Sequence, residues 1–281
     1  MKKVLCYYHE NCVDGFMSWF IVHEIYPDAI GVPYNFKPMP TQEGEFDLII
    51  CVDCVVPEVI NYNKPILIID HHKGNLAALG KIQQYCQEKG ICLETSFTED
   101  KSGAYLTWEW FHPHSNVPWL VYYISDRDTW QWLLTESKEI NEAIRIVPFT
   151  LDDYLEMWQN SRMSELAKVG RVLLKQSEVA IERCLKHKHL LTVSSLDGSY
   201  SRAFESINSQ LYQSEIGNAI AQSNTDNIGL VYYIDGQSMR CSLRSIGDVD
   251  VSEIAKRFGG GGHKNAAGFE IPIKDGKVGV Q

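Results

Sequence analysis

Three contiguous ionisable residues, Asp70, His71 and His72, directly follow the apolar run Pro65–Ile69. The run is too short for a typical helix and too continuously apolar for a half-exposed strand, so it predicts a central strand of a parallel sheet. Ligands of open α/β sheets bind beyond the carboxyl ends of the strands. The acid and the two histidines therefore indicate a chemical site, although a capped strand end with a polar turn is the simpler alternative.

Other polar residues follow comparable segments. Residues 4–8 and 46–52 predict two more buried strands, and an apolar helix is expected over 16–26. The apolar segment 119–124 is compatible with either a helix or a strand. These segments would deliver the following side chains to one edge of the sheet: His9, Asp14, Asp53, Asp70, His71, His72 and Asp126.

Carboxylates and neutral imidazoles together are the ligand set of divalent first-row metals such as manganese, iron, cobalt or zinc. Several acids at one site would repel one another without cations. Two ions roughly 3.5–4 Å apart could share a bridging carboxylate and activate a water molecule. Such a site suits hydrolysis of a phosphoester or a phosphoanhydride.

The elements around these residues predict an α/β protein. Alternation of strands and helices in the first half indicates a doubly wound, mainly parallel sheet. Helical periods with charged faces follow, which either connect two domains or complete the first. The last ninety or so residues predict a smaller α/β domain with antiparallel strands. We predict the divisions 1–135, 136–189 and 190–281.

The smaller domain carries two motifs suited to anions. Arg244 offers a planar fork for a phosphate. Four consecutive glycines, Gly259 to Gly262, precede His263 and would let the backbone present N–H groups to an anion. A flexible turn is the more common explanation of a glycine run, but the arginine and the histidine favour a binding site.

Composition restricts the partners. The 281 residues have a net charge of −10, which argues against a protein that grips long duplex nucleic acid. The eight cysteines are scattered and predict reduced thiols in a cytoplasmic protein. Neither a signal peptide nor a membrane-spanning run is expected. A homodimer is compatible with the sequence, which does not fix the oligomeric state.

The Asp70–His72 triplet and the stretch from Arg240 to Ile271 resemble the DHH phosphoesterase superfamily, in particular its first subfamily, which carries a glycine-rich DHH-associated C-terminal domain. That subfamily includes nanoRNases, single-strand exonucleases and phosphodiesterases of cyclic or linear dinucleotides. The resemblance implies a metal-bearing N-terminal domain and a substrate-binding C-terminal domain.

The resemblance also implies roles for individual residues. It makes Asp53 a bridging ligand of two ions and Asp70 a residue that orients His71. It sets His72 against the scissile phosphate. The implied metal ligands are His9, Asp14, Asp53, His71 and Asp126. The implied substrate-binding residues are His72, Arg244, Gly261, Gly262 and His263.

The first motif departs from the family pattern. Many relatives place two aspartates there, separated by one residue, whereas this chain offers only Asp14. Asn11 or Cys12 stands near the missing position, so one metal site could be altered or weakly loaded. In the fourth motif, Asp128 is a rival to Asp126.

These observations predict a cytoplasmic phosphodiesterase or phosphatase that uses one or two divalent ions, with Mn²⁺ as the first expectation. Linear dinucleotides or very short oligonucleotides are the expected substrates. Three alternatives remain: a cyclic-dinucleotide phosphodiesterase, a hydrolase of polyphosphate or pyrophosphate, and a nucleotide sensor with a weakened catalytic site.

Overall fold

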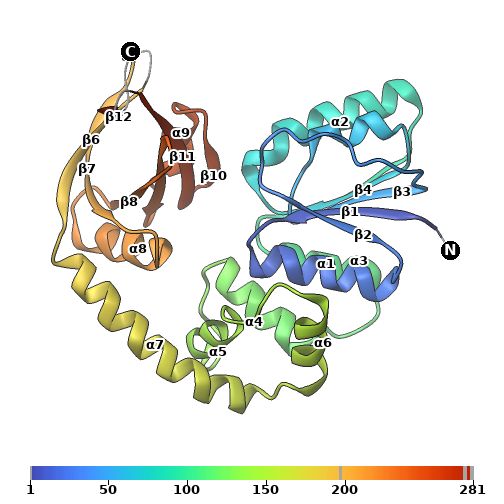
Figure 1. Ribbon diagram of the computed structural model, residues 1–281, viewed down its shortest axis with the longest axis horizontal. Helices are drawn as coiled ribbons and strands as arrows, with labels where there is room; N and C mark the ends of the chain where they lie inside the picture. The colour runs from blue at the N-terminus through green and yellow to red at the C-terminus, as the bar shows by residue number, and fades with distance from the viewer. Residues whose placement is uncertain (1, 196–197, 275–276, 279–281) are drawn as a thin grey trace. The chain divides into compact units, whose positions relative to one another are not determined.

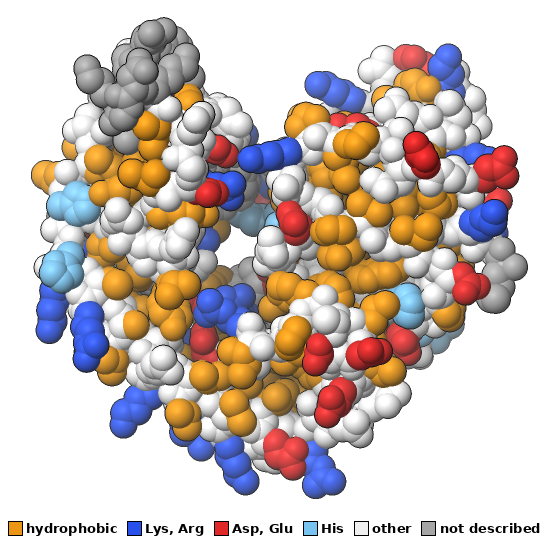
Figure 2. All heavy atoms as spheres, in the orientation of Figure 1, with side chains coloured by type: hydrophobic (Ala, Val, Ile, Leu, Met, Phe, Trp, Pro, Cys, Tyr) orange, Lys and Arg blue, Asp and Glu red, His pale blue; other side chains and the backbone are white. Residues whose placement is uncertain are grey.

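The computed structural model describes residues 2–195, 198–274 and 277–278. The chain divides into two compact units, Met1–Leu174 and Lys175–Gln281, and most of their elements are labelled in Figure 1. Among the helices described, none combines the length and the apolar character that crossing a bilayer requires. Acidic and basic side chains are interspersed on the face shown in Figure 2, with hydrophobic side chains visible between them.

The first unit is built on a five-stranded sheet in the order β2-β1-β3-β4-β5, in which every neighbouring pair is parallel. Its strands are β1 (Val4–His9), β2 (Ile30–Tyr34), β3 (Leu48–Val52), β4 (Ile66–Asp70) and β5 (Leu93–Phe97). Its first helices are α1 (Val13–Ile25), α2 (Leu76–Lys89), α3 (Gly103–Phe111) and α4 (Trp119–Asp128), with 3₁₀ turns at Pro57–Tyr62 and Lys73–Asn75.

The central strands are buried on both faces, which explains their continuous apolar sequences. In β1, Val4 and Cys6 belong to the core that contains α1, α3 and α4. Leu5 and Tyr7 point the opposite way, into the core that α2 covers. The predicted doubly wound, parallel sheet is therefore confirmed.

Three further helices follow, α5 (Ser137–Ile144), α6 (Leu151–Asn160) and α7 (Met163–Leu185). Ile140 of α5 and Tyr154 of α6 are fully buried in the same core as α1. Helices α5 and α6 thus pack within the first unit, and the boundary between the two units falls within α7. The division at residues 135 and 189 stays a prediction.

The second unit is a mixed sheet in the order β10-β11-β9-β8-β7-β6, with β12 paired to β11. Among the strand pairs that the structure describes in this unit, only β7–β8 is parallel. The elements are β6 (His189–Ser194), β7 (Ser201–Asn208), α8 (Gln213–Ser223), β8 (Ile228–Asp235), β9 (Ser238–Ser245), α9 (Val251–Lys256), β10 (Gly261–His263), β11 (Ala266–Lys274) and β12 (Lys277–Val278). Its two faces carry separate cores, one with α9 and one with α8, so a smaller α/β unit is confirmed.

Two local differences from the sequence prediction affect the site. Helix α1 begins at Val13, three residues before the expected start at Phe16, so Asp14 lies in its first turn. The segment left open between helix and strand is a helix, α4, whose last residue is Asp128. Both differences change the direction in which an acidic side chain points.

Candidate functional site

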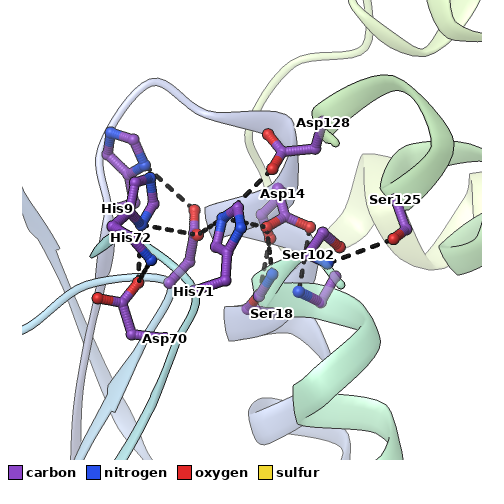
Figure 3. A network of polar contacts seen from close by, with 12 residues as sticks. His9, Asp14, Ser18, Asp70, His71, His72, Ser102, Ser125 and Asp128 are labelled. Atoms are coloured by element: carbon purple, nitrogen blue, oxygen red, sulfur yellow. Dashed lines mark hydrogen bonds and ion pairs between the residues drawn. The ribbon is translucent and has the colours of Figure 1, made fainter. Parts of the chain in front are cut away.

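The carboxyl ends of three adjacent strands supply the centre of the candidate site. His9 ends β1, Asp53 follows β3, and Asp70 ends β4 directly before His71 and His72. These strands are neighbours in the sheet, and all run in the same direction, so their ends meet at one edge. Helices α1, α3 and α4 approach the same edge from one face of the sheet, as Figure 3 shows.

Asp53 is the shared partner of three imidazoles. Its Oδ2 lies 3.1 Å from Nδ1 of His9, and its Oδ1 lies 3.1 Å from Nε2 of His71 and 3.6 Å from Nδ1 of His72. The side chain is 1% exposed, yet Oδ1 accepts no hydrogen bond of good geometry from the described residues. A buried carboxylate oxygen without such a bond is costly, so the site lacks a further positive partner.

Asp14 is held by the amino end of α3. Its carboxylate accepts hydrogen bonds from the backbone N–H groups of Gly103 (2.6 Å) and Ala104 (3.0 Å), where the helix dipole favours negative charge. A Cβ at position 103 would lie 2.6 Å from Cβ of Asp53 and 3.0 Å from Oδ2 of Asp14. Gly103 is therefore required for this close approach. The sequence marked a helix start here but gave no sign of the contact.

Asp128 is the third acid of the cluster. Its Oδ2 lies 3.3 Å from Nε2 of His71, and Oδ2 of Asp14 lies 3.9 Å from the same nitrogen. Asp14, His71 and Asp128 therefore offer three ligand atoms within 4.8 Å of one another. The last turn of α4 and the first turn of α1 present these acids toward one imidazole (Figure 3).

Asp126, the expected ligand, does not join this cluster. Its carboxylate accepts hydrogen bonds from the backbone of Leu133 and Leu134 and from the hydroxyl of Ser137. Residues two apart on a helix point in different directions, so Asp126 and Asp128 cannot both face the same site. Asp126 fixes the loop between α4 and α5, and we replace it with Asp128 in the candidate ligand set.

Asp70 also differs from its expected role, because it contacts His72 rather than His71. Its Oδ1 lies 2.7 Å from Nδ1 of His72, and its Oδ2 accepts a hydrogen bond of 2.7 Å from Asn75. The fully buried acid thus fixes the direction of the His72 ring. Asn75 is a supporting residue that sequence reasoning missed.

The charges of the cluster depend on one another. Burial alone would raise the pKa of Asp53, but the imidazoles of His72, His71 and His9 hold it well below its usual range. Burial, together with the carboxylates of Asp53 and Asp128, raises the pKa of Asp14 well above its usual range.

His71 responds in the opposite direction. Burial alone would lower its pKa, but the carboxylates of Asp53, Asp128 and Asp14 raise it to about 10. Without a metal, a proton on His71 is thus what offsets the repulsion of three acids. A divalent cation would offset the same repulsion and engage Oδ1 of Asp53, so these donors fit a divalent metal ion.

The expected substrate residues of the second unit share one face of its sheet. Arg244 of β9 and His263 of β10 both align with Ala266 of the intervening β11. Residues directly opposite each other across strands point to the same face. Arg244 donates hydrogen bonds to Ser242 and to Ser214 of α8, so this face is the one that α8 covers.

The glycine run has different roles at different positions. A Cβ at Gly260 would lie 2.1 Å from the carbonyl oxygen of Gly268, and one at Gly262 would lie 2.4 Å from that of Ala266. These two glycines are needed for packing against β11. A Cβ at Gly261 would meet nothing within 4 Å, and this residue lies in β10 two positions before His263, on the same face. Gly261 is thus half-buried, with open space on the face that it shares with His263.

The sequence of the second unit is similar to a described family. A family model for the DHHA1 domain matches residues 203–277. The second unit carries a DHHA1 domain. Since the Asp70–His72 triplet stands at the end of β4, both units of the chain resemble the DHH superfamily.

Two curated relatives of this chain are similar over most of its length. It is 26% identical over 297 residues to the uncharacterized protein R106 of Acanthamoeba polyphaga mimivirus, covering 93% of this chain and 66% of that protein. It is 26% identical over 224 residues to the oligoribonuclease NrnB of Bacillus subtilis, covering 76% of this chain and 55% of NrnB. This chain thus spans less than two thirds of the length of either relative.

A solved structure also overlaps with this chain. The pGpG-specific phosphodiesterase PggH of Vibrio cholerae is 13% identical, with 98% of this chain and 95% of that chain covered and a TM-score of 0.49. An overlap this loose has no bearing on activity.

Proposed function

We propose that the chain is a metal-dependent phosphoesterase that hydrolyses short phosphorylated nucleotides, with linear dinucleotides or very short oligonucleotides as substrates. The observation that carries this proposal is the largely buried cluster around Asp53, in which three acids and three histidines converge. The similarity to a protein named oligoribonuclease supports the substrate class.

Two groups of side chains would hold divalent ions. Asp14, His71 and Asp128 form one group, and His9 with Asp53 contributes to the other, with Asp53 lying between them. Mn²⁺ is the proposed ion, and iron, cobalt and zinc are alternatives compatible with the same ligands. When bound, the ions would supply Lewis acidity and offset the charge of the phosphoryl group.

His72 would act on the phosphate itself. Its Nδ1 lies 2.7 Å from Oδ1 of the buried Asp70 carboxylate, which holds the ring in one orientation. We assign Nε2 to the phosphoryl or leaving oxygen, with which it would share a hydrogen bond. Asp70 and Asn75 would then keep His72 in a productive orientation.

The second unit would bind the part of the substrate that does not react. The proposed binding residues are Arg244, Gly261, Gly262 and His263. Cross-strand register aligns Arg244, Gly261 and His263 on one face of the sheet. The hydrogen bonds from Arg244 to Ser214 and Ser242 would hold its guanidinium in place for a phosphate. Gly262 would contribute its backbone, which has a φ of 140° that glycine adopts readily.

A series of linear RNA substrates of two to about ten nucleotides, assayed with added Mn²⁺, tests the function. We expect mononucleotide release to be fastest for the shortest members and to be lost in Asp53→Ala. Turnover of a cyclic dinucleotide in preference to linear ones, or release of inorganic phosphate from polyphosphate alone, would indicate one of the rival hydrolases. Tight dinucleotide binding without turnover in metal-loaded protein would indicate a sensor.

The setting of the enzyme is part of the same proposal. We place its activity in the cytoplasm on small nucleotides, without a membrane or a long duplex as a partner. A homodimer is proposed as its assembly, and light scattering of the purified chain would give the mass that supports or excludes it.

A further inference from the structure

Cys12 occupies the position in the first motif where many members of the family have an aspartate. The pattern has two acids separated by one residue, and here Cys12 and Asp14 are separated by Val13. Asn11 is the other residue near this position, but it is exposed and its backbone is left-handed, with φ 55°. The structure therefore distinguishes two residues that the sequence left as alternatives.

The Cys12 side chain lies among potential metal ligands. His9, Cys12 and Asp53 offer a nitrogen, a sulfur and a carboxylate oxygen that all lie within 4.8 Å of one another. Although Cys12 is the N-cap residue of α1, its side chain caps no backbone N–H of the helix. Its sulfur therefore has no helix-capping role that would compete with metal binding.

The surrounding backbone keeps this geometry fixed. A Cβ at Gly15 would lie 2.4 Å from the carbonyl oxygen of His9 and 2.8 Å from its Cβ, so the first turn of α1 is pressed against the end of β1. This contact holds Cys12 beside His9. The second observation is at Asp53, whose side chain is 1% exposed. Its Oδ2 lies 3.1 Å from Nδ1 of His9, and its Oδ1, on the side of His71, has no hydrogen bond from the described residues. A cation bound by His9, Cys12 and Asp53 would give this buried carboxylate a further positive partner.

We propose that Cys12 is a metal ligand of this chain, acting as a thiolate beside His9 and Asp53 in place of the aspartate of its relatives. The thiol proton is released to solvent, and the sulfur lone pair binds the ion. Thiolate ligands favour softer ions such as Zn²⁺, Co²⁺ and Fe²⁺ over Mn²⁺. This site is thus selective for softer metals, whereas Asp14, His71 and Asp128 provide the harder, oxygen-rich set. The inference concerns the same centre as the proposed function and rests on it.

Cobalt substitution tests the proposal, because a thiolate bound to Co²⁺ produces a sulfur-to-metal charge-transfer absorption that nitrogen and oxygen ligands do not. We expect this band in the Co²⁺-loaded wild type and in Cys184→Ser, a control at another half-buried cysteine. The band should be absent from Cys12→Ser and Cys12→Asp, while the weaker visible absorption of bound Co²⁺ persists in both. Cobalt binding without the band in the wild type, or a band that survives in Cys12→Ser, would overturn the proposal.

Metal competition gives a second readout. Replacing the thiolate by a carboxylate in Cys12→Asp should shift the ratio of Zn²⁺ to Mn²⁺ affinity toward Mn²⁺ by about tenfold or more, measured by equilibrium dialysis. An unchanged ratio contradicts a sulfur ligand. If the wild type hydrolyses dinucleotides but its Co²⁺ form lacks the charge-transfer band, the Cys12 inference fails and the proposed function stands. If the Co²⁺ form has the band but the protein cleaves no phosphoester, the proposed function fails and Cys12 remains a ligand.

Discussion

The two units of the chain gather polar side chains in different ways. In the first, the ends of parallel strands meet at one edge, and buried acids and histidines from distant parts of the sequence converge on Asp53. In the second, cross-strand register places Arg244, Gly261 and His263 on one face of a mixed sheet. Strand direction therefore builds the proposed reaction centre, and strand register builds the proposed binding surface.

The largest expected effect is on the first of these arrangements. Asp53→Asn removes the negative charge shared by the ligands, so we expect hydrolysis to fall by on the order of 10³-fold or more, since metal-assisted charge stabilisation is worth several kcal/mol. Initial rates with a linear dinucleotide at saturating Mn²⁺ would measure the loss. The variant should remain folded by circular dichroism, because Asn has nearly the volume of Asp. Wild-type rates in this variant would remove Asp53 from the centre.

Asp126 and Asp128 allow a sharper comparison within one helix. Asp128→Asn should weaken metal binding by roughly 10- to 100-fold while leaving the unfolding free energy almost unchanged, because its side chain is partly exposed and belongs to the cluster. Asp126→Asn should do the opposite. It should cost about 1–3 kcal/mol of stability through its buried hydrogen bonds and leave metal affinity intact. Isothermal titration and urea unfolding of both variants would separate the roles, and the reverse pattern would contradict this assignment.

In the second unit we expect an effect on binding rather than on chemistry. Arg244→Lys keeps the charge but loses the fork that bonds to Ser214 and Ser242. We expect KM for a dinucleotide to rise by about 10- to 100-fold, the value of a lost charge-assisted hydrogen bond or two. The kcat for a simple phosphodiester such as bis(p-nitrophenyl) phosphate should stay the same. A matching loss of kcat with that small substrate would place Arg244 in the reaction centre instead.

The glycine run offers a smaller effect with an internal control. Gly261→Ala fills open space and should raise KM for a dinucleotide several-fold without loss of stability. Gly262→Ala forces a Cβ into the backbone of Ala266 at a φ of 140° and should lower the thermal midpoint. Thermal unfolding and steady-state kinetics of both variants would distinguish them. Equal destabilisation by the two substitutions would show that the whole run has only a packing role.

Proton release is the smallest expected signal. His71 has a pKa of about 10 without metal, so it is protonated near neutral pH, whereas a metal ligand must be deprotonated. Metal binding should therefore release protons at pH 7, and affinity should rise as the pH rises toward 10. Titrations in buffers of different ionisation enthalpy would count these protons. Metal binding with no proton release would exclude His71 as a ligand.

The same contrast explains what could be predicted from sequence. The run before Asp70 and the segments before His9 and Asp53 revealed the parallel sheet, because strands buried on both faces have continuous apolar sequences. Parallel direction alone then brought their ends together. The closeness of these residues therefore followed from local pattern and topology.

Helix phase and side-chain partners could not be predicted in this way. In a strand, Asp126 and Asp128 would share a face, but in α4 they point apart, and periodicity did not distinguish the two cases. The close approach of Gly103 to Asp53 joins parts of the chain about fifty residues apart and leaves no local pattern. The choice of His72 rather than His71 as the partner of Asp70 depends on rotamers that sequence does not specify.

Anomalous diffraction from crystals of the full chain grown with Mn²⁺ would test the central claim most directly. We predict a peak bounded by Asp14, Asp53, His71 and Asp128, with Asp126 too far away to be a ligand. Manganese bound elsewhere in the crystal, with no peak beside Asp53, would contradict the proposed centre and the hydrolysis assigned to it.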